Sequence, residues 1–216
     1  MFFRKLLERL FRRINFLRRI EAQSPRALFL ANRGSTLISK SRSKITLFGR
    51  VSFGFPLTDR TLFSTLPKTV LFLGENSSIT FLGNASIAQG VSIMVGKNAS
   101  VVIGDGVTIA HNTQVLCNKH ISIGAGSTIS WNALLIDTDN HHPLSSDGKS
   151  LRLPVVPLII GERVGIQANV TIPRGVTIGD DAVIGAGTVL RQNIDSACIV
   201  YAEQKLRIKR GLLSGL

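Results

Sequence analysis

The chain has 216 residues, 44% of them hydrophobic, which is enough apolar material for a substantial buried core and argues against overall disorder. Its formal net charge of +13 is unevenly distributed. Residues 1–50 contain 13 basic and two acidic side chains, whereas residues 51–190 contain 8 basic and 9 acidic ones. A nucleic-acid groove needs a basic stripe, so the near-neutral main body argues against nucleic acid as a partner.

Residues 1–20, MFFRKLLERLFRRINFLRRI, have the pattern of a basic amphipathic helix. Apolar residues recur every three or four positions, which makes one stripe, and arginines crowd the remaining surface. The helix either lies in a membrane interface or against an acidic partner, or it packs on the protein with its arginines solvated. The acid-poor polar face favours the first interpretation. The stripe consists of Phe3, Leu7, Leu10, Ile14 and Leu17.

The two cysteines, Cys117 and Cys198, have no CxxC spacing and indicate reduced thiols in the cytoplasm rather than a disulfide framework. No apolar run reaches the roughly 18 residues of a membrane span. Arginines interrupt every apolar stretch of the N-terminus, so no signal peptide is expected. The expected location is therefore cytoplasmic, with possible peripheral contact at the inner face of the membrane through residues 1–20.

Residues 160–190 repeat with a period of six. Written in sixes, they read IGERVG, IQANVT, IPRGVT, IGDDAV and IGAGTV, then Leu190, and an aliphatic residue opens every unit. The register returns upstream at Ile103, Ile109 and Val115 and, after a two-residue insertion, at Ile123. A six-residue period fits a short strand plus a turn, with one side chain pointing to a central core. Three such units close a triangular coil, so stacked units predict an all-β parallel β-helix.

Three segments follow from this reading. Residues 1–44 are a basic amphipathic helix and linker, residues 45–190 form the β-helix domain, and residues 191–216 form a short C-terminal cap. The hexads stop after Ile136 and resume at Ile160. The sequence between them has three prolines and few aliphatic inward positions, so a protruding loop is expected over 137–158.

The hexads IIGERVGIQANVTIPRGVTIGDDAVIGAGTVL, together with IGAGSTISWNALLIDTDNHH, resemble the hexapeptide-repeat acetyltransferases. The closest subgroup is similar to bacterial polysaccharide O-acetyltransferases of the colanic acid, maltose and galactoside acetyltransferase type. The likeness covers about 70–205 and implies a left-handed coil, a homotrimer and acetyl-CoA bound between neighbouring subunits. Two departures stand out. Gly165 follows Val164 where the family often has Trp, and YAEQK replaces the usual GxPAK.

The loop begins DTDNHHPL, and this cluster can supply a general base. Transfer of an acetyl group to a hydroxyl needs a base near neutral pH, which suits imidazole, and a carboxylate that orients it. The family pattern DxDxH favours His141 as the base, and a second family form, H-P, places it at His142. Asp137 or Asp139 is the expected orienter. The alternative is a solvated turn in which Asp and Asn cap their own backbone.

The resemblance implies further site residues. Trp131 and Asn132 are expected to line the acceptor pocket, unless Trp131 is an ordinary surface aromatic. Three small residues are expected to let the pantetheine arm approach, although any β-helix turn favours small residues. Two arginines are expected to bind the CoA phosphates, unless they are merely solvated. These cofactor-binding candidates are Ala168, Gly185, Ala186, Arg174 and Arg191.

The leading hypothesis is an acetyl-CoA-dependent O-acetyltransferase that modifies a sugar hydroxyl of a cell-surface polysaccharide or its lipid-linked precursor. One alternative is a metal-dependent β-helix enzyme of the carbonic-anhydrase kind, which needs three placed histidines. The family spacing H-x-x-x-x-H is absent, so no metal is expected. The other alternative is a non-catalytic scaffold.

Overall fold

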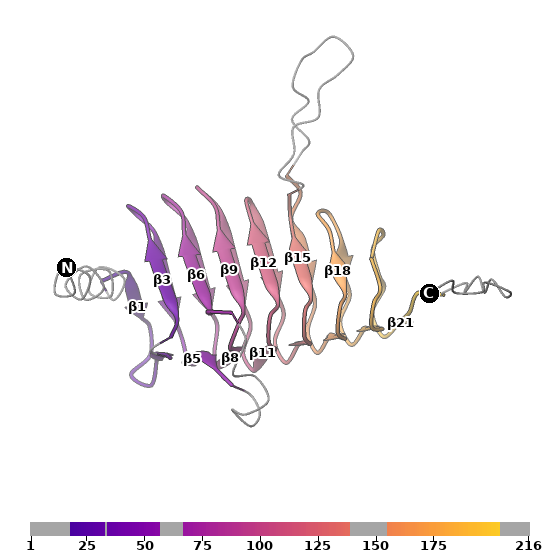
Figure 1. The fold of residues 1–216 in the computed structure, drawn as a ribbon, viewed down its shortest axis with the longest axis horizontal. Helices are drawn as coiled ribbons and strands as arrows, with labels where there is room; N and C mark the ends of the chain where they lie inside the picture. The colour runs from indigo at the N-terminus through magenta and orange to yellow at the C-terminus, as the bar shows by residue number, and fades with distance from the viewer. Residues whose placement is uncertain (1–17, 33, 57–66, 139–154, 204–216) are drawn as a thin grey trace, which may run out of the picture.

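The structure is a computed structural model that describes residues 18–32, 34–56, 67–138 and 155–203. The described residues form 21 short strands and no helix, and they wind into a solenoid with three flat faces (Figure 1). The all-β prediction is confirmed. The amphipathic helix predicted at the N-terminus lies almost entirely outside the described residues and stays a prediction.

Each face of the solenoid is one parallel sheet. Sheet 1 consists of β1 (Ile20–Ala22), β4 (Lys44–Leu47), β7 (Ser78–Phe81), β10 (Ser100–Ile103), β13 (His120–Ile123), β16 (Leu158–Ile160) and β19 (Thr177–Ile178). Sheet 2 consists of β2 (Leu28–Ala31), β5 (Arg50–Phe55), β8 (Ala85–Ala88), β11 (Val107–Ile109), β14 (Thr128–Ile129), β17 (Gly165–Ile166), β20 (Val183–Ile184) and β21 (Ile199–Val200). Sheet 3 consists of β3 (Thr36–Ser39), β6 (Val70–Leu73), β9 (Ser92–Val95), β12 (Gln114–Cys117), β15 (Leu134–Ile136) and β18 (Thr171–Ile172).

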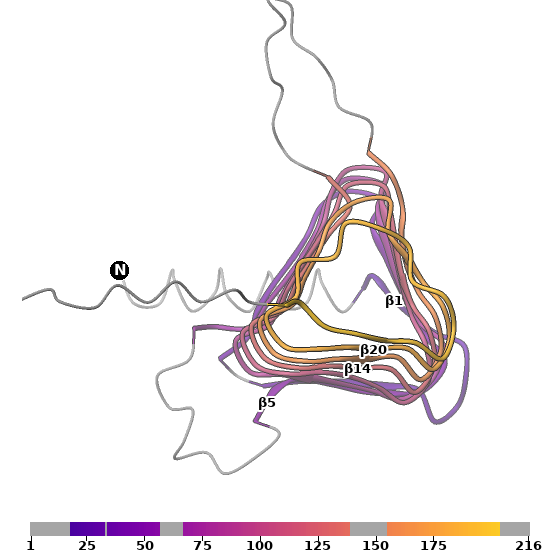
Figure 2. The same ribbon diagram turned by 90° about the vertical axis from the view of Figure 1, so that its right-hand side faces the viewer.

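The chain passes from sheet 1 to sheet 2 to sheet 3 in every coil, and the coils stack into a triangular prism (Figure 2). Viewed from the C-terminal end, the chain turns clockwise as it approaches the viewer, which is a left-handed coil. The predicted left-handed β-helix is confirmed. We name the three edges corner 1–2, corner 2–3 and corner 3–1 after the sheets that they join.

Aliphatic side chains fill the centre of the prism. Strand residues alternate between the two faces of a sheet, so each short strand places one or two side chains inside. The hexad openings Ile160, Ile166, Ile172, Ile178 and Ile184 are all at most 2% exposed. Burial of such a side chain contributes about 1.5–3 kcal/mol, and the repeated contribution along the axis holds the coils in register.

The strict six-residue period belongs only to the C-terminal coils. There Ile160 pairs with Ile178, 18 positions later. Upstream, Val101 pairs with Ile79 and Ile121, at separations of 22 and 20 positions. Extra residues at the corners lengthen these coils without moving the inward positions. The first strand of the solenoid begins at Ile20, whereas the hexads predicted that the domain starts at position 45.

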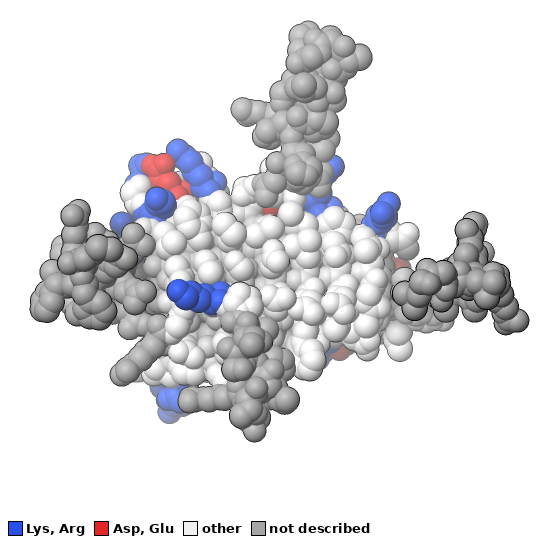
Figure 3. Space-filling view, viewed as in Figure 1, with Lys and Arg blue, Asp and Glu red and all other residues white. Residues whose placement is uncertain are grey.

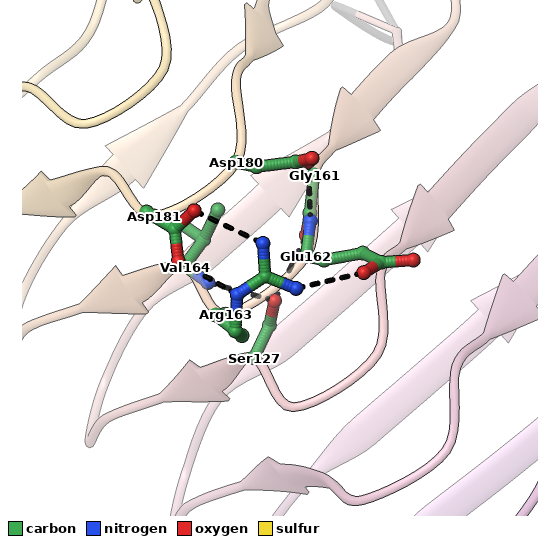
Figure 4. Close-up of polar contacts among 7 residues, drawn as sticks. All are labelled: Ser127, Gly161, Glu162, Arg163, Val164, Asp180 and Asp181. Atoms are coloured by element: carbon green, nitrogen blue, oxygen red, sulfur yellow. Dashed lines mark hydrogen bonds and ion pairs between the residues drawn. The ribbon is translucent and has the colours of Figure 1, made fainter.

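Corner 1–2 is held by tight turns. A Cβ built at Gly124 would overlap the backbone of Gly161 and Glu162 in the next coil, so only glycine allows the two coils to approach this closely. Ser127 fastens the same pair of coils, because its hydroxyl donates to the Gly161 carbonyl at 2.9 Å and accepts from the Val164 N–H at 3.0 Å (Figure 4).

Acidic side chains cap the next turns of this corner. Asp180 accepts a hydrogen bond from the Glu162 N–H at 2.8 Å, and Arg163 binds both carboxylate oxygens of Asp181, at 2.7 and 3.0 Å (Figure 4). The hydrogen bond and charge of Arg163 lower the pKa of Asp181. Because this ion pair is exposed, it helps to fix the relative position of the two coils but adds little to the free energy of unfolding.

Candidate active site

The coil is interrupted at corner 3–1, beyond β15. The described residues stop after Thr138 and resume with Val155, and both ends lie at this corner, where the Val156 N–H donates to the Asp137 carbonyl at 3.3 Å. Asp139, His141 and His142 lie outside the described residues, so their predicted roles stay predictions. The structure does describe the first two residues of the DTDNHHPL segment, Asp137 and Thr138, and their contacts with the preceding coil.

Asp137 makes most of these contacts. Its side chain is fully buried, and its two oxygens accept three backbone N–H groups from the turn of the preceding coil. Oδ1 accepts from Asn118 at 2.7 Å, and Oδ2 accepts from Lys119 at 2.7 Å and from His120 at 2.8 Å. Backbone N–H groups that converge on a carboxylate form strong charge-assisted hydrogen bonds. Asp137 therefore ties the start of the interrupted segment to the coil below it.

The two-residue insertion predicted from the hexads lies at this same turn. After Cys117 the chain needs Asn118 and Lys119 to round the corner before β13, which exposes N–H groups that the β-ladder does not satisfy. Asp137, from the next coil, satisfies them. The sequence signals for both features were visible, a slipped hexad and an aspartate, but their contact follows only from the stacking of coils.

Three further side chains lie near Asp137, in the coils that precede it. The Ser100 hydroxyl and His120 Nδ1 share a hydrogen bond of 2.7 Å on the outer face of sheet 1. The buried Cys117 thiol contacts Asp137 Oδ2 at 3.5 Å. Burial and the negative charge of Asp137 both raise the pKa of Cys117, so this thiol stays protonated near neutral pH.

Trp131 and Asn132 lie at corner 2–3, across sheet 3 from the interruption. Trp131 is 47% exposed, and its ring meets His111 edge-on with centroids 6.5 Å apart. Asn132 has a left-handed backbone with φ of 57°, and its side-chain oxygen accepts from Asn112 Nδ2 at 2.7 Å. Burial lowers the pKa of His111. One strand, β15, separates this pair from Asp137.

The predicted cofactor-binding residues divide between the same two corners. Ala168, Gly185 and Ala186 follow β17 and β20 at corner 2–3, where the Gly187 N–H donates to the Ala168 carbonyl at 2.9 Å. Arg174 follows β18 and Arg191 follows the Val189 bridge, so both lie at corner 3–1 with Asp137. Within one chain, the small residues and the arginines are therefore on opposite edges of sheet 3.

Sheet 3 has an apolar outer face. Phe72, Met94, Leu116 and Ile136 occupy one outward ladder in consecutive coils. The corresponding ladder of sheet 1 carries Thr80, Val102, Ser122 and Ile159. Figure 3 looks onto the sheet 3 face and shows it almost free of charged atoms where it is not covered by grey.

Two kinds of feature are absent from the part of the chain that the structure describes. No group of three or more His, Cys, Asp and Glu side chains is placed there to hold a metal ion. Nor does that part contain a helix of the length and hydropathy needed to cross a bilayer.

A left-handed β-helix with a six-residue period in its C-terminal coils, interrupted at corner 3–1 where a histidine-bearing sequence begins, is the architecture expected from the resemblance to hexapeptide-repeat acetyltransferases. Comparison with known proteins agrees: residues 157–192 match the family described as bacterial transferase hexapeptide (six repeats). The predicted resemblance to the hexapeptide-repeat transferases is therefore confirmed over residues 157–192.

Among curated relatives, galactoside O-acetyltransferase of Escherichia coli (strain K12) is 39% identical over 74 residues, which are 33% of this chain and 35% of that protein. The match thus spans about a third of the relative's length.

Among solved structures, the polySia specific acetyltransferase NeuO aligns with a TM-score of 0.50 and 19% identity, over 91% of this chain and 93% of that one. A mutant of AntD, an N-acyltransferase from Bacillus cereus in complex with dTDP and coenzyme A, aligns with a TM-score of 0.49 and 20% identity, over 72% and 90% of the two chains. At such identities the first likeness shows the fold.

Proposed function

We propose that the protein is an acetyl-CoA-dependent O-acetyltransferase that modifies a sugar hydroxyl, with His141 or His142 as general base. The observation that carries the proposal is the interruption of the hexad solenoid at corner 3–1, where the sequence DTDNHHPL begins with the buried, hydrogen-bonded Asp137. The likeness to the galactoside O-acetyltransferase of E. coli supports the choice of an acetyl group and of a sugar acceptor.

The proposed reaction needs one base that acts twice. Bound acetyl-CoA would supply an activated acetyl thioester. The neutral histidine removes the proton of the acceptor hydroxyl as its oxygen attacks the carbonyl carbon, and the resulting imidazolium returns the proton to the departing sulfur as the C–S bond breaks. The products are the sugar acetate and free coenzyme A, so protons and electrons balance without a further reactant.

Asp139 is the better of the two candidate orienters. Both Asp137 oxygens already accept backbone N–H groups, at 2.7 and 2.8 Å, so this carboxylate has little capacity left for an imidazole. Asp139 is two residues from His141 in the sequence, as the family pattern DxDxH expects. A carboxylate on the second ring nitrogen would fix the tautomer of the base.

We further propose that a complete site needs two chains of a homotrimer. The interruption and Arg174 lie at one edge of sheet 3, and Ala168 and Gly185 lie at the other edge. A site composed of corner 3–1 of one subunit and corner 2–3 of its neighbour would bring the two sets together. The apolar outer ladder of sheet 3, including Met94 and Leu116, would then be covered by the partner.

The remaining parts of the proposal rest on sequence. Small residues at Ala168, Gly185 and Ala186 would let the pantetheine arm approach, and Arg174 and Arg191 would meet the CoA phosphates. The basic segment 1–20 would hold the enzyme at the inner face of the membrane, in the cytoplasm, beside a lipid-linked polysaccharide precursor.

The test is thiol release from acetyl-CoA with a panel of sugars and envelope glycan precursors. We expect sugar-dependent thiol release in the wild type and its loss, by about 100-fold or more, in either His141→Ala or His142→Ala. The variant that loses activity identifies the base, and the other is the matched control. If the wild type neither turns over nor binds acetyl-CoA while it remains a folded trimer, the scaffold alternative replaces this proposal.

A further inference from the structure

The N-terminal coils contain a depression that none of the assigned roles uses. It lies on sheet 2 at corner 1–2, where two adjoining hollows of about 600 Å3 and about 220 Å3 share Arg50 and Asn84. Arg26 lines the larger hollow, and Ser52 and Ser86 line the smaller one. We propose that this depression binds an anionic sugar chain, which makes the acceptor an acidic glycan. This inference rests on the proposed sugar acetyltransferase function.

The two arginines come from neighbouring coils. Leu28 pairs with Arg50 across β2 and β5, and Arg26 precedes Leu28 by two residues. Adjacent coils in a parallel sheet are about 5 Å apart, so the two guanidinium groups can reach one acidic group or two successive ones. A guanidinium donates two parallel hydrogen bonds to a carboxylate or a phosphate, which is the geometry that an acidic sugar offers.

Within the described residues no acidic side chain neutralises these two guanidinium groups, in contrast to three cations at or beside corner 3–1. Arg42 and Lys97 bind Glu75 at 2.7 and 3.0 Å, and Lys44 binds Glu21 at 3.2 Å. Within the described part of the chain, neither Arg26 nor Arg50 forms an ion pair. Their backbone N–H groups bind Ser24 and Asn84, which fixes the turns and leaves the side chains at the surface.

The distribution of charge along the solenoid also favours an anionic ligand at the N-terminal coils. The described residues between 18 and 56 include seven Lys or Arg and one Glu, whereas those between 155 and 203 include three basic and five acidic side chains. An acidic polymer would therefore be attracted to the N-terminal coils and repelled from the C-terminal ones.

A track of hydroxyl groups leads away from the depression along the outer face of sheet 2. Ser52, Ser86, Thr108 and Thr128 occupy one outward ladder in four consecutive coils. Each is at least partly exposed, and the ladder contains no charged residue. Hydroxyl groups at one-coil spacing can donate to and accept from sugar hydroxyls. The track therefore extends the arginine site into a surface for a chain rather than for a single anion.

The experiment measures binding by the full-length protein without acetyl-CoA, so it does not depend on turnover. The probes are a short oligomer of sialic acid, which carries one carboxylate per sugar, a neutral dextran of equal length, and vesicles containing phosphatidylglycerol. We expect the sialic acid oligomer to bind and the dextran not to bind. The double variant Arg26→Gln/Arg50→Gln should weaken binding of the oligomer about tenfold or more.

The matched control is Arg42→Gln/Lys97→Gln, which removes the same net charge from cations that are already paired. It should weaken binding less than threefold, roughly the effect of lost long-range attraction. Equal losses in the two double variants, or equal binding of dextran, overturn the proposal. So does a result in which only the vesicles bind and the Arg26→Gln/Arg50→Gln variant loses that binding. His141→Ala and His142→Ala should leave oligomer binding unchanged, which separates this test from that of the catalytic proposal.

Discussion

Replacement of Asp137 by Asn should destabilise the protein far more than its small chemical change suggests. The carboxylate accepts N–H groups on both oxygens, so the introduced amide must turn an NH2 group toward at least one backbone N–H. That contact has two donors and no acceptor, in a side chain that is fully buried. One lost charge-assisted hydrogen bond and one unsatisfied buried donor together amount to about 3 kcal/mol. For a chain of this length the loss corresponds to about 6–12 °C in Tm.

Thermal unfolding of wild type, Asp137→Asn and Asp180→Asn measures this effect. Asp180 also caps a turn of the preceding coil, but it is exposed and, among the described residues, accepts only the Glu162 N–H, so its change should cost under about 1 kcal/mol. If both variants melt within about 1 °C of each other, the three hydrogen bonds do not stabilise the fold as argued. At a temperature where both variants are folded, Asp137→Asn should also lower kcat more, because the histidine-bearing sequence begins at Asp137 and not at Asp180.

Three further predictions concern single groups in the solenoid. Because burial lowers the pKa of His111, the unfolded chain binds a proton more readily, so stability should be constant above about pH 6.5 and fall below it; His111→Gln should flatten this decline in a series of melts from pH 7.5 to 5. An exposed-thiol reagent should titrate Cys198 quickly in the native protein and Cys117 only after denaturation, and rapid reaction of both thiols would contradict the burial of Cys117. Gly124→Ala should destabilise by about 2–4 kcal/mol in denaturant titrations, whereas Gly165→Ala, whose added methyl would meet no atom closer than 3.8 Å, should change stability by under about 1 kcal/mol.

The architecture was predictable because the inward positions are local. An aliphatic residue at each hexad opening determines which side chains enter the core, and no long-range information is needed to recognise that Ile160, Ile166 and Ile172 point inward. The interruption was predictable for the same reason, since a segment without inward aliphatics cannot line the core. The left hand of the coil came from family resemblance, and the structure confirmed it.

The tertiary structure alone decided which residues share a corner. Coil length varies between 16 and 25 positions in the coils that contain neither residues 57–66 nor residues 139–154, so corner turns of different length displace residues around the prism without altering the hexad pattern. For that reason the sequence did not reveal that Asp137 binds the turn at Asn118, nor that Arg26 and Arg50 meet at one depression. The sequence by itself determined the period, the inward residues and the place of the interruption, because these depend on neighbours within a few positions. The contacts between coils depend on the lengths of the turns, which the hexad pattern does not give and which only the folded chain shows.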